Sequence, residues 1–335
     1  MANQPKTLPQ LTREEMTPPV IQPVPPGIKR PRWSVMIPTY NCARFLRETI
    51  ESVLSQDIDP AEMQIEVIDD CSTSDDPEAV VREFGQGRVS FYRQRANAGA
   101  IPNFNSCIER STGHYVHILH GDDFVKPGFY RAIEERVEEH GEEIALFIVR
   151  CLVIDEHGAL VSLTPRIKEL EFPSRDPSYM FLDNSVRTPG CVVRRSFYEQ
   201  YGGFLSPLVH TADWEMWARA TALGTGIFVN EPLAVYRFFD GNETGRLART
   251  GENMRDYYRL SQVMANRYSA YPRLQFVQGI ADGAAGQAAR FKAMENQDGA
   301  QANLCVMLAL QREIPVDIKT IPRRALMKAA SLFSL

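Results

Sequence analysis

Residues 33–73 read WSVMIPTYNCARFLRETIESVLSQDIDPAEMQIEVIDDCST, and this stretch decides the fold class. It holds two apolar runs, Trp33 to Ile37 and Ile65 to Ile68, which have the length and composition of buried strands. Between them, apolar residues recur at the spacing of one helix face at Leu46, Ile50, Val53 and Leu54. A strand, a helix and a second strand in this order predict a βαβ unit, which is the building block of a parallel sheet.

The same rhythm continues along the chain. Two further strands are expected at Val89 to Tyr92 and Tyr115 to Leu119, separated by a helix with Phe104 on its apolar face. The pattern then changes over 144–163, where an antiparallel pairing through a turn is expected. A helix follows at Asp213 to Leu223, and two more strands are expected at Gly226 to Val229 and Leu233 to Phe238. The sequence therefore predicts an α/β protein with a mixed, mostly parallel central sheet flanked by helices.

Three segments differ in composition. Residues 1–32 contain eight prolines and little hydrophobic periodicity, which predicts a disordered or extended N-terminal arm. The patterned part follows as one domain over 33–250, with halves at 33–123 and 124–250. Residues 251–335 have mostly helical patterning and are expected to form a helical C-terminal extension.

Composition bounds the class of protein. A chain of 335 residues that is 44% hydrophobic and 24% charged can bury one large core, with or without a smaller appendage. The net charge of -5 argues against nucleic acid as a partner, because nucleic-acid binding normally requires a basic surplus on one face. Six cysteines stand singly without a CxxC pair or a preceding signal peptide, which favours a reduced, cytoplasmic protein.

Membrane contact is limited to one candidate segment. No run approaches the ~18 consecutive apolar residues that a spanning helix needs, so an integral membrane protein is not expected. After Asp317 the chain has no acidic residue, and four cations interleave with apolar residues, namely Lys319, Arg323, Arg324 and Lys328. This basic C-terminal tail either makes peripheral contact with the inner membrane face or docks on the protein body with its charges in water.

Two pairs of adjacent carboxylates follow predicted strands. Asp69-Asp70 comes after Ile65 to Ile68, and Asp122-Asp123 comes after Tyr115 to Leu119. Neighbouring carboxylates resist joint ionisation, and a bound divalent cation removes that cost. One such pair also occurs in solvated turns or at helix N-termini. Two pairs at the carboxyl ends of strands, where open α/β sheets bind ligands, predict a metal and diphosphate site.

The motifs in their order resemble those of the family 2 glycosyltransferases with the GT-A type fold, a Rossmann-like nucleotide-diphospho-sugar transferase fold. The resemblance runs from about Trp33 to about Arg237. It is carried by Pro38-Thr39-Tyr40-Asn41, Asp69-Asp70-Cys71-Ser72-Thr73, Asn97-Ala98-Gly99, Asn103, Asn105, Gly113, Leu119-His120-Gly121-Asp122-Asp123, Thr188-Pro189-Gly190, Arg194-Arg195-Ser196, Gly202-Gly203-Phe204 and Ala212-Asp213-Trp214-Glu215.

The resemblance implies a role for each matching residue. Residues 33–123 would form the nucleotide-binding half and 124–250 the acceptor half of a catalytic domain. Asp123 would be the main ligand of Mn²⁺ or Mg²⁺, and Asp213, which opens its helix, would be the general base. The nucleotide sugar would be bound by Pro38, Thr39, Tyr40, Asp70 (through the base, usually uracil), Asn97, Asn105, Asp122 (through the ribose or sugar) and Arg237.

The implied reaction is a single in-line displacement at the anomeric carbon, which inverts its configuration. Asp213 would take the proton of the acceptor hydroxyl as the metal neutralises the departing diphosphate. The donor is expected to be a nucleotide diphosphate sugar, a UDP-sugar by preference, and the acceptor a glycan or lipid-linked molecule of cell-surface polysaccharide or glycolipid synthesis. An Asp in the first turn of a helix can equally be a structural capping residue.

One departure from the family pattern weakens the predicted metal site. In many members a Tyr-Arg pair is followed by a metal-binding histidine, whereas Tyr236-Arg237 is followed here by Phe238-Phe239-Asp240. Water, phosphates or Asp240 would then complete the coordination. The loop 240–251 is either a lid or solvated, and one of Arg237, Arg246 or Arg249 is expected to meet phosphate. The alternative function is a non-catalytic GT-A-fold protein that binds nucleotide sugar or glycan.

Overall fold

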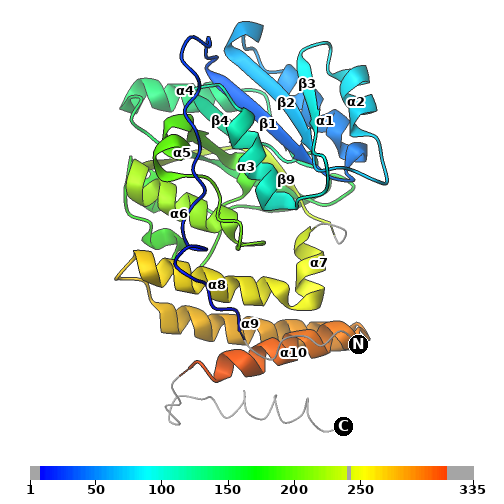
Figure 1. The fold of residues 1–335 in the computed structure, drawn as a ribbon, viewed down its shortest axis with the longest axis vertical. Helices are drawn as coiled ribbons and strands as arrows, with labels where there is room; N and C mark the ends of the chain where they lie inside the picture. The colour runs from blue at the N-terminus through cyan, green and yellow to red at the C-terminus, as the bar shows by residue number, and fades with distance from the viewer. Residues whose placement is uncertain (1–7, 240–242, 315–335) are drawn as a thin grey trace.

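The computed structural model describes residues 8–239 and 243–314, and within them a nine-stranded sheet forms the centre of the molecule (Figure 1). The strands lie in the order β3-β2-β1-β4-β8-β6-β9-β5, with β7 paired to β6. Their bounds are β1 Trp33–Thr39, β2 Met63–Asp69, β3 Val89–Arg93, β4 Tyr115–Ile118, β5 Phe124–Val125, β6 Leu146–Ile154, β7 Leu160–Leu163, β8 Cys191–Arg194 and β9 Gly226–Arg237.

The sheet is mixed and mostly parallel, as the sequence predicts. β3, β2, β1 and β4 pair in parallel, as do β6 and β9, whereas β8, β7 and β5 pair antiparallel to their neighbours. The register pairs Thr39 with Asp69, so β1 and β2 end side by side. Parallel strands present their carboxyl ends at one edge, and this edge therefore collects the polar residues that follow β1, β2 and β4.

Helices cover both faces of the sheet and bury two separate apolar cores. Alternate residues of β1 point to opposite faces, because Val35 and Ile37 belong to one core and Met36 to the other. The core of Val35 is covered by α1 Ala43–Leu54, α2 Pro77–Phe84 and α4 Phe129–His140. The core of Met36 is covered by α3 Ala100–Arg110, α5 Arg195–Tyr201, α6 Ala212–Gly224 and the helices that follow β9.

The second half of the sheet differs from the expectation in one detail. The expected strands at Gly226 to Val229 and Leu233 to Phe238 are one continuous strand, β9. Its pairing with β6 shifts register around Arg150. The residues between the two expected strands therefore lie within β9, opposite this irregularity, and do not form a turn. The expected antiparallel pairing is confirmed between β6 and β7. The long β9 matters for function because its end reaches the loop after β4.

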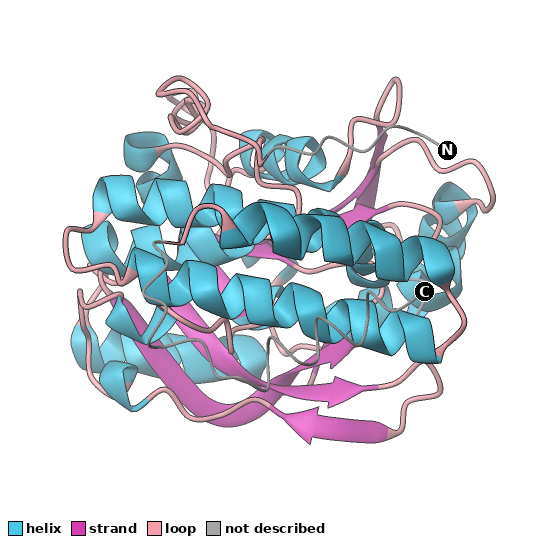
Figure 2. Cartoon of the chain, turned by 90° about the horizontal axis from the view of Figure 1, so that it is seen from below, coloured by secondary structure: helices cyan, strands magenta, loops and turns pink. Residues whose placement is uncertain are grey.

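The C-terminal part is helical, as expected. It contains α7 Glu243–Thr250, α8 Glu252–Arg267, α9 Arg273–Ala293 and α10 Gln297–Gln311. Figure 2 shows the long helices of this part lying across one side of the molecule, with the strands beyond them. None of the helices in the described ranges is long and apolar enough to cross a bilayer. The basic C-terminal tail lies outside the described residues.

The N-terminal arm lies extended along the protein over residues 8–32, and this corrects the alternative of a disordered arm for that range. In Figure 1 it runs from the sheet past α6 to α8. Ile21 is buried in the core, and the Gly203 amide donates to the Pro19 carbonyl at 2.9 Å. At its other end, Gln262 of α8 bonds the backbone of Pro9 and Leu11. The prolines keep the arm from forming regular structure, but its apolar residues still pack.

Two glycines in this region offer a matched test of the packed arm. Gly202 has φ +82°, and a Cβ there would lie 2.7 Å from the Pro19 carbonyl oxygen, whereas Gly27 has φ +87° and open space. Both Gly202→Ala and Gly27→Ala strain the backbone, but only Gly202→Ala pushes the arm away. We expect Gly202→Ala to lower the free energy of unfolding by about 1–2 kcal/mol more than Gly27→Ala. It should also speed tryptic cleavage after Arg13; equal effects would contradict the packed arm.

Candidate functional site

The residues after β1 and β4 meet closely at the carboxyl edge of the sheet. The Gly121 amide donates to the Pro38 carbonyl at 3.0 Å, and a Cβ on Gly121 would lie 3.1 Å from Thr39 Oγ1. Thr49 of α1 donates its hydroxyl to the carbonyls of Gly121 and Asp123, at 3.1 and 2.7 Å. The turn that carries Asp122 and Asp123 is therefore fixed from two sides, and it passes β1 so closely that a side chain at Gly121 would be crowded.

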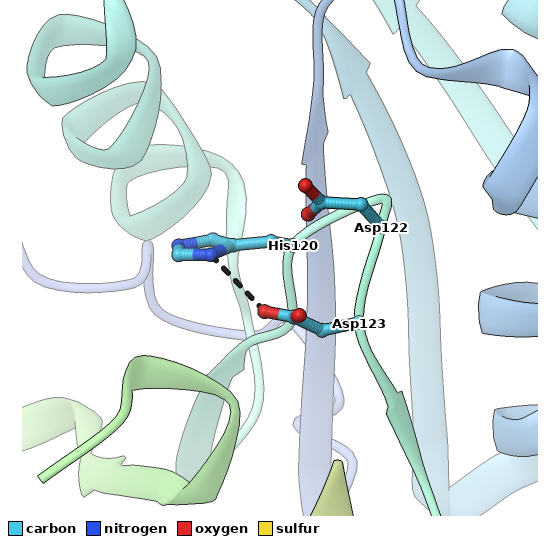
Figure 3. Close-up of side chains that lie close together, drawn as sticks. All are labelled: His120, Asp122 and Asp123. Carbon is cyan, nitrogen blue, oxygen red and sulfur yellow. Dashed lines mark ion pairs between the residues drawn. The ribbon is translucent and has the colours of Figure 1, made fainter. Parts of the chain in front are cut away.

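Asp123 is buried with one carboxylate oxygen unpartnered. Its Oδ1 accepts the backbone N–H of Arg237, at the end of β9, at 2.8 Å. Its Oδ2 lies 3.3 Å from His120 Nδ1 but has no aligned hydrogen bond within 8–239 and 243–314, and His120 Nε2 has no partner in these ranges either. In Figure 3 the side chains of His120, Asp122 and Asp123 all point to the same side of the turn. A buried carboxylate oxygen without a donor is costly unless something else binds it.

The pKa values follow from this crowding. Burial and the neighbouring Asp123 charge raise the pKa of the Asp122 carboxyl. Burial alone would lower the pKa of His120, but its contact with Asp123 and the charge of Asp122 outweigh burial and raise that pKa. Two carboxylates and an imidazole thus share a site whose negative charge is only partly neutralised by the protein.

The residues fit a divalent cation. One ligand atom from each of His120, Asp122 and Asp123 lies within 4.8 Å of the others, and the unpartnered Asp123 Oδ2 is among the oxygens available. Carboxylate oxygens suit Mg²⁺ and Mn²⁺, and an imidazole nitrogen is acceptable to Mn²⁺. His120 was not among the expected metal ligands, although its place two residues before Asp122 in the same turn was the available signal.

Asp213 and the Asp122 turn line one cavity with a volume of about 470 Å³. Asp213 lies in the first turn of α6, where Oδ2 accepts from Thr188 Oγ1 at 3.2 Å and Oδ1 from the Trp214 amide at 2.7 Å. Burial raises the pKa of the Asp213 carboxyl, against the lowering effect of His210 and of the Trp214 amide. A carboxylate with a raised pKa in a cleft can accept a proton from a bound hydroxyl group.

The loop that leads into α6 is held by a residue from another helix. The N-cap position is Thr211, and the buried Asp256 of α8 accepts the amides of Val209, His210 and Thr211 at 3.1, 2.8 and 2.8 Å. Asp213 is therefore not the N-cap residue, although its Oδ1 accepts the Trp214 amide. Asp256 could not be singled out from the sequence, because it lies 45 residues from Thr211 and no local pattern marks it.

The expected nucleotide-binding residues cluster at the far side of the same edge. Both oxygens of Asp70 accept backbone amides, from Ala98 and Gly99, at 2.9 Å each. Asn97 donates to the Asp70 carbonyl at 3.2 Å, and burial raises the pKa of Asp70. Tyr40, beyond Pro38 and Thr39, is 46% exposed. The structure thus brings Pro38, Thr39, Tyr40, Asp70 and Asn97 together beside the start of α3.

Two residues that were expected to bind the ligand form hydrogen bonds with other groups of the protein instead. Asn105 is buried, and its amide bonds both the N–H and the carbonyl of Phe204, at 2.8 and 3.0 Å, so it does not line the cavity. Arg237 borders the cavity, but its guanidinium is buried against the Asp122 carbonyl, at 3.0 Å, and the Glu48 carboxylate. Sequence alone could not reveal these contacts, because their partners are distant in the chain.

Two histidines near the acidic residues and the expected lid differ in whether they border the cavity. His117 is buried between Tyr130 and the Pro189 carbonyl, whereas His210 borders the cavity and contacts the Tyr257 hydroxyl at 3.2 Å. The expected lid is helical from Glu243 onward, and Arg246 pairs with Glu243. Asp240, the suggested extra metal ligand, lies outside the described residues.

Comparisons with known proteins agree with this geometry. Residues 34–202 match the model of the family described as Glycosyl transferase family 2. An uncharacterized protein of Mycobacterium tuberculosis, MT1568, is 27% identical over 69% of this chain and 75% of its own length. The putative teichuronic acid biosynthesis glycosyltransferase TuaG of Bacillus subtilis is 28% identical over 64% of this chain and 81% of its own.

Solved structures show the same fold. Residues 1–349 of Staphylococcus aureus TarS in complex with UDP-GlcNAc align with a TM-score of 0.52 at 14% identity, over 84% of this chain and 92% of that one. The mannosyltransferase PcManGT of Pyrobaculum calidifontis, in complex with GDP-Man and Mn²⁺, aligns with a TM-score of 0.52 at 15% identity, over 90% and 91%. These two neighbours have the GT-A fold, which was the predicted fold class.

The link between α8 and α6 can be tested with two carboxylates that share a partner. Arg259 pairs with both Asp256, at 3.0 Å, and Glu252, at 2.7 Å, but only Asp256 also holds residues 209–211. Asp256→Asn is expected to lower the free energy of unfolding by about 2–4 kcal/mol, because several buried N–H groups lose a charged acceptor. Denaturant unfolding and amide exchange at 209–211 measure this. Glu252→Gln should change both much less, and an equal effect would contradict the role of Asp256 in holding this loop.

Proposed function

Because the chain belongs to glycosyl transferase family 2, we propose that it transfers a sugar from a UDP-sugar to an acceptor hydroxyl with inversion at the anomeric carbon. The observation that carries this proposal is the shared cavity of Asp122, His120 and Asp213. Its volume of about 470 Å³ is in the range of small-molecule sites and suits the transferred sugar with part of the acceptor. UDP as the nucleotide is supported by the UDP-GlcNAc complex of the structural neighbour TarS.

The metal end of the site would be built by the turn after β4. Asp123 is proposed as the main ligand, with Asp122 and His120 beside it in place of the histidine that is missing after Arg237. A bound Mn²⁺ or Mg²⁺ would supply positive charge to the leaving diphosphate. The role of Arg237 is then to hold the Asp122 carbonyl and the Asp123 carboxylate in place.

The base and ribose would lie beyond this turn, against the residues that follow β1 and β2. Asp70 fixes the Ala98 and Gly99 amides. The lone pairs that remain on its carboxylate oxygens would accept hydrogen bonds from the nucleotide base. Pro38, Thr39 and the exposed Tyr40 would line the other side, and Asn97 supports the loop between them. Asn105 is proposed to act only through the position of Phe204.

Asp213 is proposed as the general base. Its carboxylate borders the cavity that Asp122 and His120 also border, and the Thr188 hydroxyl and the Trp214 amide fix its orientation. The acceptor hydroxyl would pass its proton to the Asp213 carboxylate. At the same time the hydroxyl oxygen would bond to the anomeric carbon, and the bond between that carbon and the diphosphate would break. One displacement of this kind inverts the configuration.

The acceptor is proposed to be a glycan of the cell surface, free or lipid-linked. The names of several relatives support this setting, since TuaG is described as a putative teichuronic acid glycosyltransferase and GgaB as a minor teichoic acid biosynthesis protein. Donor synthesis in the cytoplasm would place the enzyme there, with the basic tail as a candidate peripheral contact at the inner membrane face.

Asp123→Asn tests the metal and nucleotide site. Removing the charge of the unpartnered oxygen should weaken UDP binding in the presence of Mn²⁺ by about tenfold or more, with little effect on UDP binding after EDTA. Calorimetry measures both. Asp57→Asn is the control, because Asp57 is exposed and lies between α1 and β2, at the opposite edge of the sheet. Wild-type protein that binds no nucleoside diphosphate under any condition would refute the donor site.

Asp213→Asn tests the general base. Because the substitution keeps the shape of the side chain and removes its basicity, kcat for sugar transfer should fall by about 100-fold or more. UDP affinity should stay within about twofold, since Asp213 lies on the acceptor side. Transfer is measured as UDP release with a panel of UDP-sugars and acceptors. Full activity of Asp213→Asn would exclude this residue as the base.

A further inference from the structure

A second cavity lies beside the first, between α6, α8 and α9, with a volume of about 550 Å³. Its lining includes Asp183, Trp214 and Tyr257, and these three residues also line the cavity that contains Asp213. The two cavities are therefore neighbours along one surface, divided only by shared side chains. We call the second one the α9 groove, after Gln275, Gln278, Gly279 and Asp282 of that helix.

The wall between the two cavities is rigid. The Trp214 ring packs edge-on against Tyr257 at 5.9 Å and against Phe276 at 5.5 Å between ring centroids. Its indole N–H donates to the Met180 carbonyl at 2.6 Å. Trp214 follows Asp213 directly in α6, so the groove begins one residue from the proposed base. A ligand that reaches Asp213 can extend along this wall onto α9.

The opposite side of the α9 groove is polar and open. Gln275, Gln278 and Asp282 are exposed, and Gln278 Nε2 donates to Asp282 Oδ1 at 3.1 Å. Gly279 lies among them, and a Cβ there would have no heavy atom within 4 Å. Amide and carboxylate groups around an open floor, with the exposed Leu182 opposite, offer the donors, acceptors and apolar contact that a sugar ring can use.

Charge restricts the ligand class. In the part of the chain that the structure describes, the residues that line the α9 groove include the carboxylates Asp183 and Asp282 and no lysine or arginine. The first cavity, by contrast, is bordered by Arg187 and Arg237. Carboxylates in the lining disfavour a phosphate-rich polymer and accept hydrogen bonds from neutral hydroxyl groups.

From this geometry we infer that the α9 groove binds the part of the acceptor that continues beyond the sugar at Asp213. The acceptor is then a neutral glycan of two or more sugar units, and chain length is recognised on α9. This inference rests on the proposed function, because it takes Asp213 as the point of transfer. It assigns acceptor recognition to a helix that lies beyond the stretch matched by the family model.

Gly279→Leu tests the groove directly, because its side chain would fill open space in the groove and leave the core untouched. Gly286→Leu is the matched control, since Gly286 is exposed on the same helix, also has open space around its Cβ, and does not line the groove. The probes are mono- and tetrasaccharides of the β-1,4-N-acetylglucosamine, α-1,4-glucose and β-1,4-mannose series, together with poly(ribitol phosphate). Their affinities are measured by saturation-transfer NMR on protein with UDP and Mn²⁺ present.

At least one neutral tetrasaccharide should bind about tenfold more tightly than its monosaccharide in wild type and in Gly286→Leu. Gly279→Leu should lose this gain but keep monosaccharide binding and UDP affinity. If Gly279→Leu folds poorly by thermal melting, Gln275→Ala should still reduce the gain. No gain with length, a gain that survives Gly279→Leu, or preferred binding of poly(ribitol phosphate) would overturn the inference. Failure of UDP binding itself would refute the proposed function instead, so the two failures are distinguishable.

Discussion

The burial of Asp123 beside Asp122 is the constraint on which the site depends. A buried carboxylate needs donors, and Asp123 receives one from the backbone of Arg237 at the end of β9. This bond requires β9 to end next to the turn after β4, which the pairing of Phe124 with Val235 enforces. Among the described residues, the remaining oxygen has His120 nearby but no aligned donor. The sheet order is thus tied to an acidic centre that the protein neutralises only in part.

A second charged residue extends this dependence to the C-terminal helices. Asp256 of α8 holds the loop that leads into α6, so the docking of α8 helps to fix the start of α6, where Asp213 lies. The docking is reinforced by a buried network in which Glu215 of α6 pairs with Arg219, at 2.9 Å, and with Arg267 of α8, at 2.6 Å. Removing one partner of such a network leaves a buried charge uncompensated. The helical extension is therefore part of what positions α6 and Asp213.

Local patterns in the sequence predicted the class of fold, the mostly parallel sheet and the strand ends that carry the two Asp pairs. These features depend on periodicity and on residue types that are adjacent in the chain. The uses of Asn105, Arg237 and Asp256 could not be predicted, because each depends on a partner more than 40 residues away. An asparagine looks the same in sequence whether its amide meets a ligand or the Phe204 backbone. The packing of the N-terminal arm was hidden for the same reason, since prolines signal only the lack of regular structure.

The distribution of charge also orders the two cavities. Diphosphate carries negative charge and needs cations, which the turn after β4 can hold and which Arg187 supplies at the border of the first cavity. The α9 groove has carboxylates and amides instead, so the same diphosphate would be repelled there. If the first cavity binds the donor as proposed, this distribution of charge would direct the donor to the sheet edge and a neutral chain to α9, with Asp213 between them. Electrostatics would then contribute to the orientation of the two substrates, together with shape complementarity.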